Sequence, residues 1–292
     1  MRGAGEGGLC YPTDMKSFSS PKKRFARPRR SSAPAAHTSW NKVADWYTDH
    51  LKERGDYQED LIFPGALKLL EARGGGVYVD LACGEGSFLQ GLTRQIRRGT
   101  LIGIDAAPKL ISHAQQQLRP TKDLRIETIV GDVSKPQPTL KGIQADGITC
   151  LMAIQNIEEI VGVFRLAAAT LKVSGQFVIV MNHPCFRQPR QSGWGWDEGR
   201  KLQYRRIDRY KSGYEMPIIA HPGVTPSVST LSYHRPLETY INALGEAGLT
   251  VNRLEEWSSK KISTSGPRAK AENAAREEIP LFLAIRAQLA KR

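Results

Sequence analysis

The chain has 292 residues, of which 40% are hydrophobic, which is enough for one large domain or two small ones. No run approaches the roughly 18 apolar residues of a membrane-spanning helix, so the sequence excludes an integral membrane protein of that kind. The first residues, MRGAGEGGLC, lack an apolar segment, and we expect no secretory signal. Lys and Arg number 42 against 29 Asp and Glu, and the net charge of +13 permits an anionic partner without indicating a fold.

The four cysteines are widely spaced, and none forms a Cys-x-x-Cys pair. This spacing excludes a zinc knuckle and argues against a disulfide framework, so we expect reduced thiols in a cytoplasmic protein. No other cluster of His, Cys, Asp and Glu has the spacing of metal ligands, so no metal is expected. The cysteines are Cys10, Cys83, Cys150 and Cys185.

Residues 1–38 are expected to be a disordered basic tail. Residues 1–40 hold eight Lys and Arg against two acids, and six of these cations lie in Pro21–Arg30, among Ser, Pro and Gly that disfavour packing. Such a tail suits RNA, a membrane surface or an import receptor, but basic runs of this kind are usually solvated extensions. Order is expected to begin with a helix near Trp40–Tyr47, with Ser39 as its N-cap.

From residue 66 onward, short β-branched runs alternate with helical segments. This alternation predicts an α/β fold, with a parallel sheet covered by helices on both faces and ligands bound at the carboxyl ends of its strands. The predicted strands are Val77–Leu81, Thr100–Ile104, Arg125–Val130, Gly147–Leu151 and Gln176–Met181, and the helices between them are Ser87–Arg97, one beginning at Pro108, and Ile157–Leu171.

A glycine-containing loop follows the first predicted strand. Gly84 and Gly86 permit a tight turn in which the backbone approaches a ligand closely. Asp105 ends the second strand nineteen residues later, where nucleoside-binding α/β folds hold a ribose diol. Asp132 ends the third strand at the same edge. Each Asp alone suits a turn or a cap, whereas Asp80, Asp105 and Asp132 at three successive strand ends predict a nucleoside site.

Two nucleoside cofactors compete for this loop. A nicotinamide dinucleotide site requires a third glycine where this chain has Leu89, which argues against a dehydrogenase. Asp80, four residues before Gly84, instead suits a cofactor with a cationic amino acid end.

These residues resemble the motifs of the class I S-adenosylmethionine-dependent methyltransferases. Asp80–Gly86 resembles motif I, and Asp105 matches the ribose-binding acid of the family. Gly131–Val133 is similar to the segment that frames the adenine, Asp146–Asn156 to the fourth-strand motif, and Leu171–Val180 to the turn into strand five. The similarity covers residues 40–182 and lies nearest the small-molecule branch that includes the quinone-biosynthesis enzymes.

The resemblance implies a Rossmann-like sheet of seven strands in the order 3-2-1-4-5-7-6, mostly parallel, with strand seven antiparallel. Thr250–Trp257 and Leu281–Ala287 match strands six and seven. It also implies S-adenosyl-L-methionine as the cofactor. The residues expected to bind it are Asp80, Ala82, Gly84, Gly86, Asp105, Asp132 and Val133.

The remaining segments are expected to complete this core. Residues 39–182 form the cofactor-binding part, residues 183–234 a β-rich lid over the acceptor, and residues 235–292 the C-terminal part, beginning with helix Pro236–Ala247. Ser258–Ile279, rich in Lys, Ser and Glu, is expected to be a solvated excursion between strands six and seven. The aromatic and basic residues of the lid suit an aromatic or anionic small molecule, and they equally suit the lid's own core.

Methyl transfer requires positioning of the acceptor and, for some acceptors, removal of a proton. His183, just past strand five, is the first candidate for the general base, with His221 and His234 as further histidines and Tyr204 and Tyr210 in reserve. An acceptor that is already nucleophilic needs none of them.

Two specialised classes fit the sequence poorly. The segment after strand four lacks an Asn-Pro-Pro-Tyr/Phe motif, which weakens an amide or adenine amino-group target. The dipeptide Pro184-Cys185 follows strand five, whereas the thiolate of RNA cytosine-C5 methyltransferases follows strand four. Two alternatives to a small-molecule methyltransferase stay open: an RNA methyltransferase that uses the basic tail, and a non-catalytic nucleoside-binding module.

Overall fold

The fold was analysed in a computed structural model, which describes residues 40–44, 46, 57–220 and 229–291. Residues 40–44 and 46 are helical, where the sequence predicts a helix. The expected basic tail and its neighbour Ser39 lie outside the described residues.

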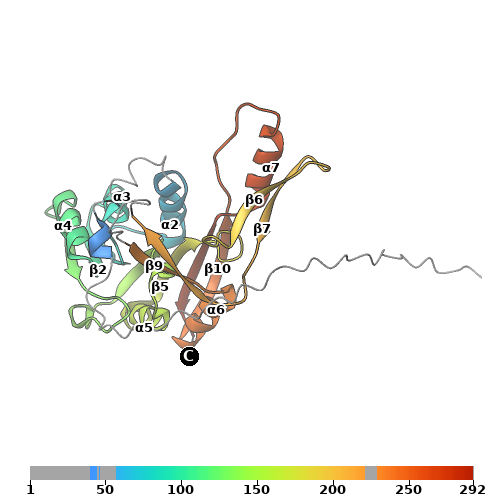
Figure 1. Cartoon of the computed structure of the whole chain (residues 1–292). Helices are drawn as coiled ribbons and strands as arrows, with labels where there is room; N and C mark the ends of the chain where they lie inside the picture. The colour runs from blue at the N-terminus through green and yellow to red at the C-terminus, as the bar shows by residue number, and fades with distance from the viewer. Residues whose placement is uncertain (1–39, 45, 47–56, 221–228, 292) are drawn as a thin grey trace, which may run out of the picture. The chain divides into compact units, whose positions relative to one another are not determined.

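The core of the chain is a seven-stranded sheet with the order β10-β11-β5-β4-β1-β2-β3 (Figure 1). Strand β11 runs antiparallel to both of its neighbours, and the pairs among β1 to β5 are parallel. The predicted α/β fold, its strand order and its antiparallel seventh strand are therefore confirmed. The strands are β1 (Val77–Leu81), β2 (Gly99–Asp105), β3 (Leu124–Val130), β4 (Ala145–Leu151), β5 (Leu171–Asn182), β10 (Leu249–Trp257) and β11 (Phe282–Leu289).

Helices cover both faces of this sheet. Alternate side chains of a buried strand point to opposite faces, so each face presents apolar side chains on which helices pack. In β1, Tyr78 belongs to one apolar cluster with α2 and α3, whereas Val79 and Leu81 belong to another with α5 and α6. The helices are η1 (Gln58–Ile62), α2 (Phe63–Leu70), α3 (Ser87–Gln95), α4 (Pro108–Gln117), η2 (Pro138–Leu140), η3 (Ile154–Asn156), α5 (Ile160–Thr170), α6 (Leu237–Glu246) and α7 (Ala269–Glu278).

The insertion after β5 is rich in β-structure, as predicted, and its described strands form two separate antiparallel pairs. Strand β6 (Ser192–Asp197) pairs with β7 (Leu202–Ile207), and β8 (Tyr214–Ile219) pairs with β9 (Ser229–His234). Strand β9 lies against η3, directly after β4, so this pair covers part of the carboxyl edge of the main sheet.

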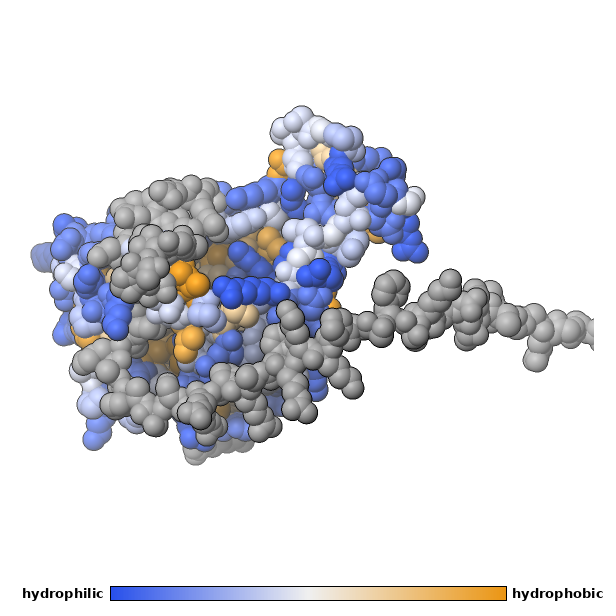
Figure 2. Space-filling view, viewed as in Figure 1, coloured by the Kyte–Doolittle hydropathy of each residue, from blue (hydrophilic) through white to orange (hydrophobic). Residues whose placement is uncertain are grey.

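The segment between β10 and β11 is more ordered than the solvated excursion that the sequence predicts. It contains α7, which packs against β7. Arg268 pairs with Glu198 at 2.9 Å and lies over the ring of Trp196 at 4.5 Å, so the segment is tied to the β6–β7 hairpin. In Figure 2 the visible surface of this region is mostly hydrophilic, in keeping with the single buried residue of α7, Ala275.

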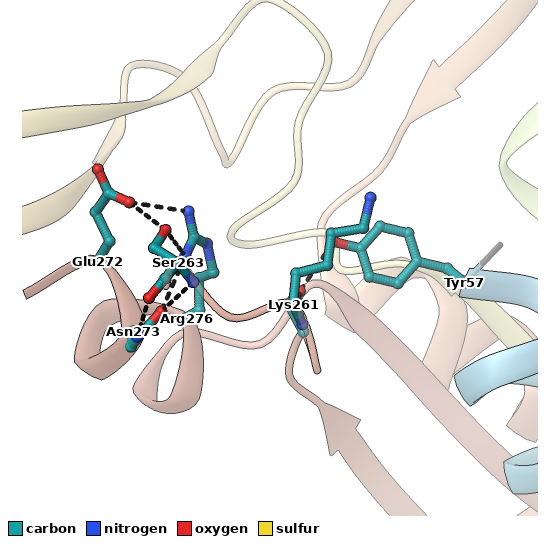
Figure 3. A network of polar contacts seen from close by, with 7 residues as sticks. Tyr57, Lys261, Ser263, Glu272, Asn273 and Arg276 are labelled. Atoms are coloured by element: carbon teal, nitrogen blue, oxygen red, sulfur yellow. Dashed lines mark hydrogen bonds and ion pairs between the residues drawn. The ribbon is translucent and has the colours of Figure 1, made fainter. Parts of the chain in front are cut away.

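Polar contacts hold the excursion together (Figure 3). The amide of Asn273 accepts a hydrogen bond from the backbone N–H of Ser263 at 2.8 Å and donates one to its carbonyl at 3.0 Å. The guanidinium of Arg276 donates to the hydroxyl of the same serine at 2.8 Å. At the start of the excursion, the Nζ atom of Lys261 lies 4.8 Å from the centre of the Tyr57 ring. These contacts explain why a hydrophilic stretch adopts a defined path.

Candidate active site at the carboxyl edge of the sheet

The loop after β1 contains three residues in the left-handed backbone region, at Ala82, Gly84 and Gly86. The two glycines serve different purposes. A Cβ atom on Gly86 would lie 3.0 Å from the side chain of Leu118, just after α4, and the φ of 81° is rarely adopted by other residues, so packing and backbone both favour glycine here. A Cβ atom on Gly84 would meet nothing within 4 Å, so the backbone there faces open space into which a ligand fits.

Asp105 is bonded directly to this loop. Its Oδ2 atom accepts a hydrogen bond from the backbone N–H of Gly84 at 2.9 Å, and its Oδ1 atom accepts one from Ala107 at 2.8 Å. Burial raises the pKa of the Asp105 carboxyl above its usual value, and these backbone hydrogen bonds lower it in part. The structure thus brings together the glycine loop and the acid expected to bind a ribose.

Asp80 is the most buried of the three expected acids, with 3% of its surface exposed. Burial raises the pKa of Asp80 to about 7, the hydroxyl of Thr149 lowers it through a hydrogen bond of 2.6 Å to Oδ1, and the charge of Asp105 raises it. At neutral pH this carboxyl is therefore only partly ionised. A cation placed beside it would complete its ionisation.

Asp132 and Val133 follow β3, whose neighbour β2 ends in Asp105. Asp132 makes local contacts: its Oδ1 atom accepts hydrogen bonds from the N–H and hydroxyl of Ser134, and its Oδ2 atom lies 3.1 Å from Nζ of Lys135. Partial burial raises the pKa of Asp132, but these contacts outweigh it, so the net shift is downward. Val133 is buried in the core.

His183 is almost fully buried just after β5, and both of its ring nitrogens are occupied. Nδ1 accepts a hydrogen bond from the backbone N–H of Cys185 at 3.2 Å, so this nitrogen carries no proton. Nε2 therefore carries the proton and donates it to Glu256 at 2.7 Å. Burial lowers the pKa of His183 in spite of this carboxylate. In this arrangement neither nitrogen is available to receive a proton from an acceptor.

The other predicted bases differ in their surroundings. His221 lies outside the described residues. His234 is buried on β9, and its Nε2 atom lies 2.7 Å from the carbonyl oxygen of Tyr210, to which it donates. The hydroxyl of Tyr210 accepts a hydrogen bond from the N–H of Leu237 at 3.0 Å. Tyr204 is 43% exposed on the β6–β7 hairpin.

A small cavity of about 20 Å³ lies where β4 and β5 end. Two acceptor atoms in its lining, Oε1 of Gln155 and Oδ1 of Asn182, are buried and have no hydrogen-bond partner among the described residues. The lining includes Gln155, Asn182, Arg187, Ser232, His234 and Arg235. Neither Gln155 nor Asn182 was among the site residues predicted from the sequence, although both follow predicted strands whose carboxyl ends were expected to face the ligand.

Backbone strain marks the same edge. Ala82 after β1 and Met152 after β4 both have positive φ, at 59° and 55°. Left-handed conformations of non-glycine residues are costly and concentrate at functional sites. A larger cavity, of about 440 Å³, lies at the amino ends of β1, β4 and β5 and is therefore on the opposite edge of the sheet from the loop after β1.

The described residues contain neither a candidate metal site nor a helix that could span a membrane. No group of three or more His, Cys, Asp or Glu side chains in this part of the chain is arranged to hold a metal ion. No helix in the same residues is long and apolar enough to cross a membrane. The cysteines that the structure describes, Cys83, Cys150 and Cys185, are all free thiols.

Comparison with known proteins identifies the central part of the chain. Residues 79–175 match a family model described as a methyltransferase domain. A methyltransferase structure from Mesorhizobium loti, described as S-adenosylmethionine dependent, is 24% identical, with a TM-score of 0.57 over 77% of this chain and 96% of that one. No curated protein matches the chain.

Two further solved structures share the fold. A putative S-adenosylmethionine-dependent methyltransferase from Listeria monocytogenes is 21% identical, with a TM-score of 0.57 over 79% of this chain and 99% of that one. A glycopeptide N-methyltransferase in complex with S-adenosylmethionine is 12% identical, with a TM-score of 0.50 over 78% of this chain and 87% of that one. Residues 79–175 therefore match a methyltransferase domain, and the chain shares the Rossmann-like fold of S-adenosylmethionine-dependent methyltransferase structures.

Proposed function

We propose that this protein transfers a methyl group from S-adenosylmethionine to a small-molecule acceptor. The proposal rests on one observation at the carboxyl edge of the sheet. Asp105 accepts a hydrogen bond from the backbone N–H of Gly84, and the buried carboxyl of Asp80 lies close enough to Asp105 for their charges to interact. The alternation of strands and helices brings these residues to one edge, and the matched methyltransferase domain contains all three.

The residues present fit this cofactor. The open space beside Gly84 admits a ligand close to the backbone, and two carboxylates favour a cationic one. When bound, the cofactor supplies a methyl group activated by a sulfonium. We assign the ribose hydroxyls to Asp105 and the cationic amino acid end to Asp80. Ala82 and Gly86 shape the loop between them.

Two further residues are assigned to the adenine. Asp132 and Val133 follow β3, next to the strand that ends in Asp105. The hydrogen bonds from Ser134 fix the Asp132 side chain, and burial fixes Val133. The loop is therefore held in one conformation before a ligand arrives.

A small molecule is the acceptor class that the insertion after β5 favours. Strand β9 lies against η3 at the carboxyl edge, and a small cavity lies beside them among the described residues. Arg187 and Arg235 line this cavity and suit an acceptor that carries an anionic group outside the cavity, beside its reacting atom. We therefore propose that residues 183–234 form a lid over the acceptor, and that the protein belongs with the small-molecule enzymes of the quinone-biosynthesis-like branch.

The hydrogen bonds of His183 bear on its proposed role as the general base. The assignment of His183 stays a prediction, and it would require the bonds to Cys185 and Glu256 to break first. The proposed role of the basic tail in RNA binding rests on residues outside the described part of the chain, so no contact in the structure favours it over a small molecule.

Calorimetry with S-adenosylmethionine tests the cofactor assignment. We expect the wild type to bind it and Asp105→Ala to lose at least about tenfold in affinity, since a hydrogen-bonded charged group contributes roughly 1.5–3 kcal/mol. Asp123→Ala, at an exposed aspartate before β3, is the matched control and should bind as the wild type does. Absence of binding to the wild type would refute the proposal. Binding without methyl transfer to any compound of a metabolite extract would support a non-catalytic module instead.

A further inference from the structure

The small cavity between η3, the end of β5 and β9 has a polar lining that the cofactor does not explain. Gln155 is contributed by η3, Asn182 ends β5, and Ser232 and His234 lie on the buried face of β9. Polar side chains that point inward from three elements are costly unless a partner satisfies them. The lining therefore indicates a ligand group with hydrogen-bonding capacity.

Two of the orphan atoms in this lining are acceptors, and one, Nη1 of Arg235, is a donor. The Nε2 atom of Gln155 donates to the carbonyl oxygen of Met152 at 2.8 Å, which fixes the orientation of the amide and leaves Oε1 without a partner. Gln155 is only 9% exposed. Oδ1 of Asn182 is also buried without a partner among the described residues. Each of these two acceptor oxygens can receive a hydrogen bond, so the expected ligand group carries two donor hydrogens.

The size of the cavity limits what can supply these hydrogens. A volume of about 20 Å³ admits roughly one water-sized group, since a water requires about 10–15 Å³ by this measure. An amino group has this size and carries two N–H donors. Nearby positive charge, from Arg187 and Arg235, disfavours an ammonium ion and so keeps the nitrogen lone pair available for reaction.

His234 supplies a basic atom in the same lining. Its Nε2 atom donates to the carbonyl of Tyr210, so the tautomer is fixed and Nδ1 carries the lone pair. The ring stacks on Tyr214, with centroids 4.8 Å apart. Burial lowers the pKa of His234, the carbonyl of Tyr210 raises it, and the charges of Arg209 and Arg235 lower it further. The imidazole is therefore neutral at pH 7 and able to accept a proton.

We propose that this cavity receives the amino group of the methyl acceptor, that Gln155 and Asn182 accept its two N–H hydrogen bonds, and that His234 takes up the proton released by methylation. The inference rests on the proposed methyltransferase activity. The nitrogen lone pair forms the new N–C bond as the S–C bond of the sulfonium breaks, and the sulfur leaves as a neutral thioether. One of the two N–H groups then leaves the amide oxygen that held it and passes its proton to Nδ1 of His234, so the positive charge passes from sulfonium to imidazolium.

The first experiment identifies the methylated atom. The wild type is incubated with methyl-labelled S-adenosylmethionine and a polar metabolite extract, and the labelled products are identified by mass spectrometry. A product methylated on an amine nitrogen supports the inference. A product methylated on oxygen, carbon or sulfur overturns it and leaves the methyltransferase proposal standing. No labelled product, together with no cofactor binding by calorimetry, refutes the methyltransferase proposal itself.

Variants of the two acceptor oxygens test recognition of the amine found in that experiment. We expect Asn182→Leu to weaken its equilibrium binding, measured by calorimetry, by about tenfold, because the substitution leaves a buried N–H without a partner. Asn182→Asp keeps the acceptor oxygens and should bind at least as well as the wild type. Gln176→Leu, earlier on the same strand, is the matched control. Equal binding by the wild type and Asn182→Leu would contradict the assignment.

His234→Gln tests the proton acceptor, because glutamine retains a donor for the carbonyl of Tyr210 but lacks the basic nitrogen. We expect cofactor affinity to be unchanged, kcat to fall by about 100-fold and the acidic limb of the pH–rate profile to disappear. His183→Gln should leave that limb in place. An acidic limb that persists in His234→Gln and disappears in His183→Gln would assign the base to the other histidine.

Discussion

The buried carboxyl of Asp80 makes the stability of the free protein depend on pH. Its pKa is 3.8 in an unfolded chain and about 7 in the fold. Because the folded pKa is raised, the folded state holds this proton more tightly. The stability associated with it is fully present below about pH 4 and is lost as the pH rises towards and through 7. Three pKa units correspond to about 4 kcal/mol in total, at about 1.4 kcal/mol per unit.

Urea unfolding of the wild type and Asp80→Asn measures this contribution. Between about pH 5 and about pH 8 the raised pKa predicts that the wild type loses about 2–3 kcal/mol of unfolding free energy through Asp80. The side chain of Asp80→Asn cannot ionise. Over the same pH range, the unfolding free energy of this variant should therefore fall by about 2–3 kcal/mol less than that of the wild type. We further expect the variant to bind S-adenosylmethionine more weakly, since it lacks the charge assigned to the cationic end of the cofactor. Parallel pH profiles for the two proteins would refute the reasoning.

Four other substitutions have distinct expected outcomes. Gly86→Ala should lower the unfolding free energy, measured in urea, by about 1–3 kcal/mol because of its positive φ and the contact with Leu118. Gly84→Ala adds a Cβ atom that touches no protein atom, so its cost should be nearer 1 kcal/mol while calorimetry shows weaker cofactor binding. His183→Ala should lower the melting temperature, with a loss of about 2–4 kcal/mol, because it leaves a cavity and an unpaired N–H; an unchanged melting temperature would exclude a structural role. Arg268→Ala should speed hydrogen exchange in β6 and β7 and change global stability by less than about 1 kcal/mol.

The main sheet was predictable because its strands carry a strong local signal. The bounds of β1 were predicted to the residue, since a run of apolar and β-branched residues lies between glycines and the turn after Asp80. The carboxyl-edge location of the glycine loop then followed from the topology of parallel sheets. The hydrogen bond between Gly84 and Asp105 joins two of the residues that were expected at this edge.

Features that depend on distant partners were not predictable. His183 suits a base by its position in the sequence, but its partner Glu256 is 73 residues away and occupies the ring nitrogen. Gln155 carries no local sign that its oxygen is buried without a partner. Helix α7 buries only Ala275, so it lacks the apolar stripe by which amphipathic helices are recognised.

The contact between α7 and the β6–β7 hairpin joins two excursions that leave the core at different points. Arg268 and Glu198 are 70 residues apart, and one lies between the last two strands of the sheet while the other follows β5. A version of the protein shortened by removal of residues 262–276 would uncover the indole of Trp196 and leave the hairpin without its support. Engineering that trims one excursion must therefore trim or redesign the other, even though the seven-stranded sheet requires neither.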